Sequence, residues 1–341
     1  MNEIVSVEVI LKSRPVGLPT LDNFDFRKVK ITDIKDGEIL VKNLFMSVDP
    51  YMRGRMNDIK TYVEPFQVGE PLSGDAVGVV LKSKSDNVKE GNYVLTNLGF
   101  REYFVADSND FDKINLEVIK PIDGISLSAY LGVLGMPGLT AYAGLLRIGA
   151  LKEGEKVFVS AAAGAVGATV CQIAKIKNCY VIGTAGSSDK IEWLLNEAKI
   201  DGAFNYKDVK NYNKILKEMF ANGIDVYYEN VGGKLLEAAL NNMNRYGRIV
   251  LCGMISLYNN KTLEPGPSNL FKAIENRLRL EGFIVFDHRD LKPQFYKDMI
   301  GWIVDGKIKW RETVYDGILK APQAFLDLFS GKNLGKMIVK L

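Results

Sequence analysis

The stretch "SAAAGAVGATV", residues 160–170, decides the fold, because it places small residues where a strand turns into a helix. The run before it, "EKVFV", is β-branched and aromatic, as strands are, and the run after it, "VCQIAKIK", has apolar residues at helical spacing. Aligned on this strand and helix, Ala162, Gly164 and Gly167 take the three positions of a G-x-G-x-x-G fingerprint, with alanine at the first.

Each position of the fingerprint has a physical purpose. A small residue permits a tight turn, Gly164 lets a pyrophosphate touch the backbone, and Gly167 lets the helix pack close to the strand. The N-terminus of the helix offers free N–H groups and a partial positive charge to the phosphates. The stretch therefore predicts a dinucleotide site.

Short apolar strands and amphipathic helices alternate from about residue 155 to 286. This alternation is typical of a parallel, doubly wound Rossmann sheet with right-handed crossovers. The expected strands are "KVFVS", "CYVIGTA", "GAFNY", "IDVYYEN", "GRIVLCG" and "LRLEGFIVF". The expected helices are 165–177, 188–199, 210–221, 234–243 and 268–277.

Residues before and after this region have a different pattern. The first 120 residues are mostly short β-rich runs separated by Gly, Asn and Asp, and residues 306–341 return to strand-like pieces. We therefore predict an α/β protein in which a Rossmann domain, residues 123–305, is inserted into a β-rich domain made of residues 1–122 and 306–341.

Composition and charge exclude several classes of function. The 341 residues hold 44 Lys and Arg against 41 Asp and Glu, and no basic stripe argues for nucleic acid. No apolar run approaches the roughly 18 residues of a membrane span, and we expect no membrane partner. Three sparse cysteines, Cys171, Cys179 and Cys252, fit reduced thiols in a cytoplasmic protein.

The end of the second strand bears on the choice of dinucleotide. NAD-selective sites carry an acid about 20 residues after the glycines, to bind the ribose 2′-hydroxyl. Here that place reads "GTAGSSDK", with hydroxyls, glycines and Lys190 at the strand's end. Asp189 reads as a helix-start residue. An ammonium is a natural partner for a phosphate, so the sequence favours NADP over NAD.

Several motifs, in this order along nearly the whole chain, resemble one family. They are "SVDPYMR" (47–53), "GMPGLTAY" (135–142), "AAAGAVGA" (161–168), "FNYK" (204–207), "ENVGG" (229–233), "GRIVLCGMISLYN" (247–259), "PGP" (265–267) and "NLGK" (333–336). The family is the prostaglandin reductase and alkenal double-bond reductase branch of the zinc-independent medium-chain dehydrogenase/reductases.

The resemblance implies a GroES-like catalytic domain beside the Rossmann domain. It implies NADPH-dependent reduction of the carbon–carbon double bond of α,β-unsaturated aldehydes and ketones, with hydride reaching the β-carbon. Homodimers are usual in the family, and "RLRLEGFIVF" is the candidate edge for such a contact.

The resemblance also assigns site residues. Tyr258 is the leading donor to the substrate carbonyl and Tyr51 is a second candidate, with the ribose hydroxyl of the cofactor as an alternative. Lys190 and Tyr206 belong to the 2′-phosphate end of the cofactor, Asn230 to the ribose region, and Asn333 to a contact from the catalytic domain. The other expected cofactor residues are Gly164, Ala165, Val166, Gly167, Cys252, Gly253, Tyr258, Phe283, Ile284 and Val285.

The presence of a zinc site can be tested in the segment "PLSGDAVGVV", because zinc-dependent relatives carry Gly-His-Glu at this place. The corresponding residues are Ser73, Gly74 and Asp75, and no cysteine precedes Cys171. A catalytic zinc needs three protein ligands, so we expect no metal. The one histidine, His288, is expected to be a polar loop residue after a strand.

Two other functions remain open from the sequence. One is an NADPH quinone reductase of the same superfamily, against which "SVDPYMR" and "ISLYN" argue. The other is a non-catalytic NADPH-binding protein, against which the retained tyrosines argue.

Overall fold

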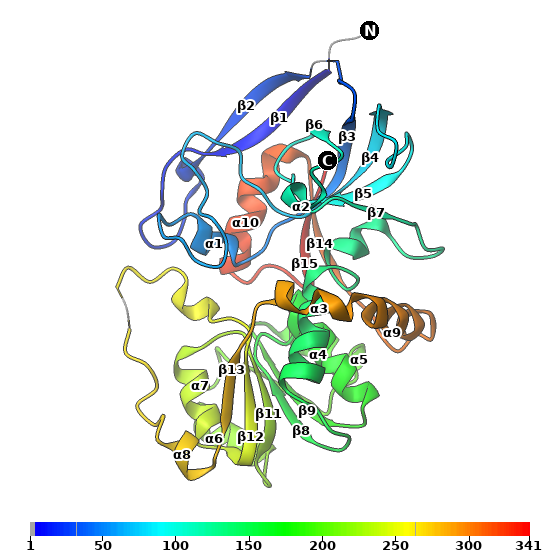
Figure 1. The fold of residues 1–341 in the computed structure, drawn as a ribbon. Helices are drawn as coiled ribbons and strands as arrows, with labels where there is room; N and C mark the ends of the chain where they lie inside the picture. The colour runs from blue at the N-terminus through cyan, green and yellow to red at the C-terminus, as the bar shows by residue number, and fades with distance from the viewer. Residues whose placement is uncertain (1–3, 32, 263) are drawn as a thin grey trace. The chain divides into compact units, whose positions relative to one another are not determined.

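The computed structural model describes residues 4–31, 33–262 and 264–341, and residues 1–3 of the predicted first domain lie outside these ranges (Figure 1). The chain divides into two compact units. Unit 1 comprises Met1–Leu131, Glu312–Asn333 and Met337–Leu341, and unit 2 comprises Gly132–Arg311 and Leu334–Lys336. The domain limits expected after residues 122 and 305 fall a few residues before these changes of unit, and as domain limits they remain predictions.

Unit 2 is built on a six-stranded parallel sheet in the order β10-β9-β8-β11-β12-β13. In chain order this is 3-2-1-4-5-6, the order of the doubly wound dinucleotide-binding fold. The strands are β8 (Lys156–Val159), β9 (Tyr180–Ala185), β10 (Gly202–Asn205), β11 (Ile224–Glu229), β12 (Met243–Leu251) and β13 (Arg279–Gly282). The predicted Rossmann sheet is confirmed, and its order reverses between β8 and β11.

Helices precede, connect and follow these strands in Figure 1. They are α3 (Met136–Tyr142), the π-helical turn η3 (Ala143–Ile148), α4 (Ala165–Ile176), α5 (Ser188–Asn196), α6 (Tyr212–Met219), α7 (Gly233–Leu240), α8 (Lys272–Glu275) and α9 (Lys292–Val304). Two 3-10 segments, η4 (Ile255–Leu257) and η5 (Val285–Leu291), follow β12 and β13. Helix α4 buries Val170, Cys171 and Ile173 completely, as its apolar spacing predicts.

Two predicted elements are much shorter than expected. The helix expected over 268–277 is only the four-residue α8, and its apolar side chains Leu270, Phe271 and Ile274 are 52%, 60% and 82% exposed. An apolar face that nothing buries does not stabilise a helix, because tertiary packing supplies most of that stability. The strand expected over 278–286 ends at Gly282, after which the chain turns into η5.

Unit 1 is β-rich, as predicted. Its main sheet runs β14-β15-β3-β4-β5-β7 with β6 paired to β3, and β1 pairs with β2 as a separate antiparallel ribbon. The strands are β1 (Ile4–Leu11), β2 (Phe24–Ile31), β3 (Glu38–Ser47), β4 (Ala76–Ser83), β5 (Tyr93–Thr96), β6 (Tyr103–Asp107), β7 (Glu117–Ile119), β14 (Glu312–Asp316) and β15 (Lys336–Lys340). The C-terminal strand β15 pairs with the central β3, which explains why the tail returns to this unit.

Short helices complete unit 1. They are α1 (Met52–Arg55), α2 (Phe111–Ile114), α10 (Ala321–Phe329) and the 3-10 turns η1 (Leu21–Asn23), η2 (Leu127–Leu131) and η6 (Ile318–Lys320). Helix α10 was not expected from the sequence, which predicted only strand-like pieces in the tail. It packs Ala324 and Phe325 into the core, where Phe325 meets Phe24 edge-on with ring centroids 6.1 Å apart.

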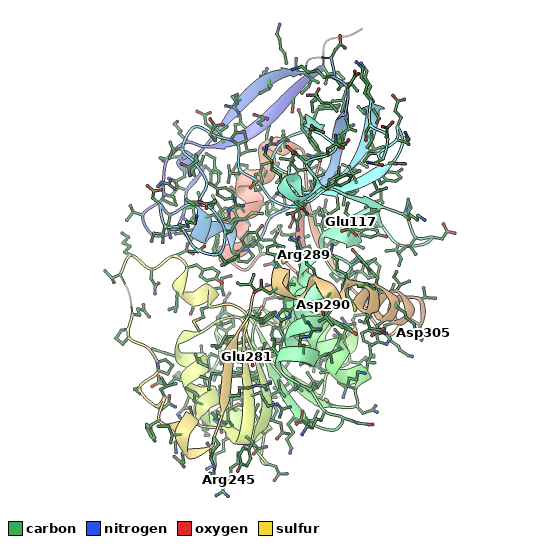
Figure 2. The ribbon with its side chains drawn as sticks, viewed as in Figure 1. Glu117, Arg245, Glu281, Arg289, Asp290 and Asp305 are labelled. Carbon is green, nitrogen blue, oxygen red and sulfur yellow. The ribbon has the colours of Figure 1, made fainter. Side chains whose placement is uncertain are left out.

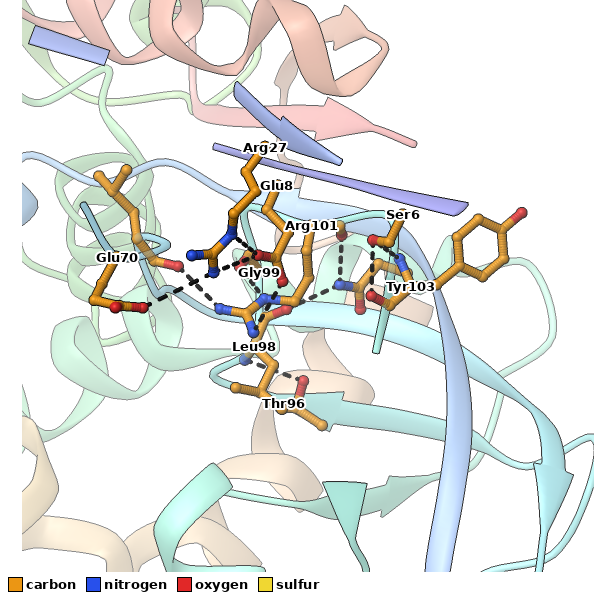
Figure 3. A network of polar contacts seen from close by, with 11 residues as sticks. Ser6, Glu8, Arg27, Glu70, Thr96, Leu98, Gly99, Arg101 and Tyr103 are labelled. Carbon is orange, nitrogen blue, oxygen red and sulfur yellow. Dashed lines mark hydrogen bonds and ion pairs between the residues drawn. The ribbon is translucent and has the colours of Figure 1, made fainter. Parts of the chain in front are cut away.

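A network of charges fastens the β1–β2 ribbon of unit 1 (Figure 3). The buried carboxylate of Glu8 accepts from Arg27 at 2.8 Å and lies 3.7 Å from the guanidinium of Arg101. Arg101 also donates to the carbonyl of Leu72, and Ser6 exchanges hydrogen bonds with the backbone of Tyr103. Because Glu8 is paired on both sides, its burial is compatible with charge.

No helix among the described residues is both long enough and apolar enough to cross a bilayer.

Candidate functional site

The turn between β8 and α4 is held by its own backbone. Ala161 has φ +47°, in the left-handed region, and its carbonyl accepts from the Gly164 amide at 3.0 Å. A Cβ at Gly167 would lie 2.4 Å from that carbonyl oxygen, so only glycine fits there. The fingerprint expected from the sequence therefore forms a tight turn with a helix packed closely against it.

The first turn of α4 leaves three amides without helical acceptors, those of Ala165, Val166 and Gly167. The N-cap is Gly164, which has no side chain to accept from them. These donors, with the positive end of the helix dipole, are suited to a pyrophosphate.

Gly335, in the tail segment that belongs to unit 2, lies on the same turn. It forms an isolated bridge with Gly164, and its amide donates to the Ala163 carbonyl at 2.9 Å. Sequence reasoning chose Asn333 from this motif and missed Gly335. The sequence clue to Gly335 was the glycine in "NLGK". In the structure this residue has a φ of +71°, in the left-handed region that favours glycine.

The end of β9 carries no acid, and its neighbours are basic and aromatic. The ring of Tyr206 lies over Gly186, where a Cβ would be 2.8 Å from a ring carbon. The Tyr206 amide donates to the Ala185 carbonyl at 3.1 Å, so the turn after β10 is fixed beside β9. Lys190 is half-buried in the first turn of α5, and burial first, then the charge of Lys207, lowers its pKa.

The end of β11 is joined to the end of β8 through a buried carboxyl group. Glu229 is fully buried and accepts from the Ser160 hydroxyl at 2.8 Å and from the Val231 amide at 2.6 Å. The Ser160 hydroxyl accepts in turn from the Asn230 amide at 2.8 Å, and the Asn230 side-chain NH₂ donates to the Ser160 carbonyl at 2.8 Å. Burial raises the pKa of Glu229, and backbone donors oppose that rise.

This network places Asn230 at the point where the strand order reverses. Its side-chain nitrogen donates to the Ser160 carbonyl, which fixes the orientation of the amide group and directs its oxygen away from that carbonyl. Sequence reasoning named Asn230 but missed Ser160 and Glu229 as its supports. The signal was a polar residue directly after each of two adjacent strands.

After β12 the chain turns, and the Tyr258 hydroxyl lies against the backbone of that turn. The amides of Cys252 and Gly253 donate to the Glu229 carbonyl at 3.0 and 3.1 Å. The Tyr258 hydroxyl accepts from the Met254 amide at 3.3 Å, and a Cβ at Gly253 would lie 3.1 Å from that oxygen. Burial raises the pKa of the Cys252 thiol to about 12.

The end of β13 is fixed by an exposed ion pair and an aromatic contact. Arg147 donates to both carboxylate oxygens of Asp290 at 2.9 and 2.7 Å, and Asp290 is labelled in Figure 2. The ring of Phe283 reaches Gly144, where a Cβ would be 2.7 Å from it. Val285 is buried and Ile284 is half-buried, and both follow the end of β13 at Gly282.

His288 lies in η5 rather than in a plain loop. Its Nδ1 is 3.3 Å from Arg147 and its ring centroid is 5.9 Å from that of Phe283. The residue supports the end of β13.

Tyr51 lies in unit 1 as the N-cap of α1. Burial, followed by the charges of Asp75 and Asp49, raises its pKa well above 10. Arg55, one helical turn later, opposes this rise. The phenol therefore stays protonated over the physiological range.

Comparisons with known proteins place the chain in a family. Residues 8–114 match the N-terminal domain of oxidoreductases, and residues 165–305 match a family described as zinc-binding dehydrogenase. A 2-alkenal reductase (NADP(+)-dependent) of Nicotiana tabacum is 44% identical over 343 residues, which are 99% of this chain and 98% of the relative. Prostaglandin reductase 1 of Bos taurus is 42% identical over 97% of each chain.

A solved structure agrees with these relatives. CurA of Vibrio vulnificus in complex with NADPH superposes with a TM-score of 0.92, at 39% identity over 98% of each chain. The chain belongs to the zinc-independent medium-chain dehydrogenase/reductases, in the prostaglandin reductase and alkenal reductase branch. The resemblance found in the sequence motifs is thereby confirmed.

The residues of this medium-chain reductase do not fit the zinc site that one matching family is named for. A Cβ at Gly74 would lie 2.4 Å from the Met52 methyl group and 3.4 Å from Phe100, so the place of a ligand side chain is filled by core. Among the residues that the structure describes, no three His, Cys, Asp or Glu side chains gather to hold a metal ion.

The structure brings most of the predicted site residues of this reductase to one sheet. The turns that follow β8, β9, β10, β11, β12 and β13 all belong to unit 2, and the carboxyl ends of parallel strands share one edge. Tyr51 and Asn333 belong to unit 1.

Proposed function

We propose that this chain is an NADPH-dependent reductase of the carbon–carbon double bond of α,β-unsaturated aldehydes and ketones. The observation that carries the proposal is the strand–turn–helix at 160–167 together with a lysine and no acid at the end of β9. The alkenal and prostaglandin reductases that match over nearly the whole chain support the substrate class.

The residues of unit 2 fit NADPH. The free amides of Ala165, Val166 and Gly167 would hold the pyrophosphate, Asn230 the ribose, and Lys190 the 2′-phosphate. Cys252, Gly253, Phe283, Ile284 and Val285 would line the nicotinamide end. The chemistry that bound NADPH supplies is delivery of a hydride to the β-carbon of the conjugated double bond.

Tyr258 would hold the proton that the carbonyl oxygen needs. As hydride reaches the β-carbon, negative charge develops on that oxygen as an enolate, and a donor placed there stabilises it. The Tyr258 hydroxyl, whose oxygen accepts from the Met254 amide, would donate its O–H to that carbonyl oxygen. A positioned acid of this kind is worth roughly 10²–10⁴-fold in rate.

Tyr51 would serve the substrate differently. Its pKa is raised by burial and by two carboxylates, so transfer of its proton is disfavoured, and we assign it to hydrogen bonding and shape. Asn333 would contact the cofactor from the tail, beside the segment that carries Gly335.

The test is a substrate screen that follows loss of NADPH absorbance. We expect turnover of a straight-chain 2-alkenal and of an enone, a saturated product with one deuterium at the β-carbon when the 4-deuterated cofactor is used, and full activity after treatment with a chelator. Faster turnover of a simple quinone would favour the quinone reductase. Tight NADPH binding without oxidation across the screen would favour a non-catalytic role.

A homodimer through β13 and a cytoplasmic location complete the proposal. Strand β13 is an edge of its sheet, and the nearby chain exposes Phe271 and Ile274. Light scattering on the purified protein tests the dimer, with Ile274→Asp expected to favour the monomer. The three free cysteines agree with a reducing compartment, which cell fractionation tests.

A further inference from the structure

A second lysine lies beside the predicted 2′-phosphate residues. Lys207 follows β10, and its ammonium nitrogen is 5.9 Å from the centroid of the Tyr206 ring. That ring lies over Gly186, at the end of β9. The Lys207 amide donates to the Asn205 side-chain oxygen at 3.1 Å, which fixes the backbone that carries the lysine. Lys207 is thus held beside the place where the sheet carries no acid.

In the part of the chain that the structure describes, the charge of Lys207 is not paired with a carboxylate. Among the described residues no carboxylate lies within ion-pairing distance of its ammonium. The adjacent Asp208 carboxylate instead accepts from the Asn205 side-chain NH₂ at 2.8 Å. Lys207 is also close enough to Lys190 to lower the pKa of that residue, after burial.

Two ammonium groups that repel one another gain free energy when an anion lies near both. A phosphate monoester carries about 1.5 to 2 negative charges at pH 7 and three acceptor oxygens, so it can accept from two lysines at once. We propose that Lys207 is a second cation for the 2′-phosphate of NADPH and acts together with Lys190. The inference rests on the proposed use of NADPH and adds a residue that sets the preference over NADH.

Lys207 should affect the binding only of ligands that carry the 2′-phosphate. Without the 2′-phosphate, the lysine meets no anion, so it contributes little to binding of NADH. With the phosphate, it contributes a charge-assisted hydrogen bond at an exposed position, which salt will weaken.

The experiment measures binding without turnover. Isothermal titration calorimetry gives the Kd of adenosine 2′,5′-bisphosphate and of 5′-AMP, which lacks the 2′-phosphate, for wild type, Lys207→Gln and Lys207→Arg. Lys210→Gln is the matched control, because it removes an exposed charge three residues further along the same turn. Thermal unfolding of each variant checks that it is folded.

We expect Lys207→Gln to weaken the bisphosphate about tenfold at low salt, to leave 5′-AMP within about twofold, and to lose most of its effect at high salt. Lys207→Arg should restore most of the binding, and Lys210→Gln should change little. An unchanged Kd for the bisphosphate, an equal loss for 5′-AMP, or an equal loss in Lys210→Gln would each overturn the inference. Normal binding of the bisphosphate in a protein that reduces no enal would instead refute the proposed function.

Discussion

The turn of Tyr258 in unit 2 and the turn of Tyr51 in unit 1 each present a candidate acid, in opposite surroundings. Tyr258 is half-exposed, with its oxygen against the backbone of Gly253 and the Met254 amide. Tyr51 lies where burial and two carboxylates hold its proton in place. Two tyrosines that are equivalent as sequence letters thus lie in different surroundings, and we expect them to differ as proton donors.

The largest effect should come from Tyr258→Phe. Loss of the hydroxyl leaves the developing charge on the carbonyl oxygen without its donor, so we expect kcat to fall by roughly 10²–10⁴-fold. The Kd of NADPH should stay within a few-fold, because the backbone around Gly253 is unchanged. Steady-state kinetics and fluorescence titration measure the two quantities, and an unaltered kcat would remove Tyr258 from the chemistry.

The second effect concerns the cofactor side of the same unit. Lys190→Ala removes a charge-assisted partner of the 2′-phosphate, which is worth about 1.5–3 kcal/mol, so the KM for NADPH should rise by about 10–100-fold. The KM for NADH should hardly move. Kinetics with both cofactors decide this, and an undiminished preference for NADPH would show that the phosphate is held elsewhere.

The third prediction uses alkaline pH to test the burial of Tyr51. Burial raises the pKa of Tyr51, Tyr227 and Tyr228 well above 10, so the stability that they contribute is complete below pH 10. It is lost as the pH rises from 10 through the folded-state pKa values, by about 1.4 kcal/mol per pH unit for each phenol.

In Tyr51→Phe the free energy of unfolding should therefore fall less steeply above pH 10 than in wild type, because one buried phenol fewer has to ionise. Urea unfolding between pH 8 and 11 measures the slope. Tyr246→Phe is the matched control, because this tyrosine is 66% exposed. The same slope in Tyr51→Phe and wild type would contradict the surroundings described for Tyr51.

The smallest effect should be that of Tyr51→Phe on turnover at neutral pH. A residue that shapes the site without giving up its proton should change kcat by less than about fivefold, well under the effect of losing an acid. A loss as large as that of Tyr258→Phe would reverse the comparison between the two turns.

Sequence reasoning succeeded where local pattern and packing agree. The turn at 160–167 was predictable because Gly167 has no room for a Cβ and its helix buries the face that its spacing indicates. It failed over 268–277, where the apolar pattern is present but the side chains stay exposed. A pattern shows which face a helix would bury, and only the fold shows whether anything covers that face.

The candidate site was predictable in its glycines and its lysine, and less so in its supports. Ser160 and Glu229 meet because β8 and β11 are neighbours, although 69 residues separate them in the chain. Of the two acids that act on Tyr51, Asp49 lies two residues away in the chain, but Asp75 is brought to it by tertiary structure, since it directly precedes β4. Such long-range pairs leave no periodic signal in one sequence.

The protonation state of the three thiols affects how long the protein stays active. Burial raises the pKa of Cys171, Cys179 and Cys252, and it is the thiolate that attacks electrophiles. Conjugated aldehydes alkylate thiolates, so a catalyst that meets them at every cycle risks inactivation by its own substrate. With its sulfurs kept protonated, this protein should resist such suicide modification and keep working at aldehyde concentrations that poison enzymes with reactive cysteines.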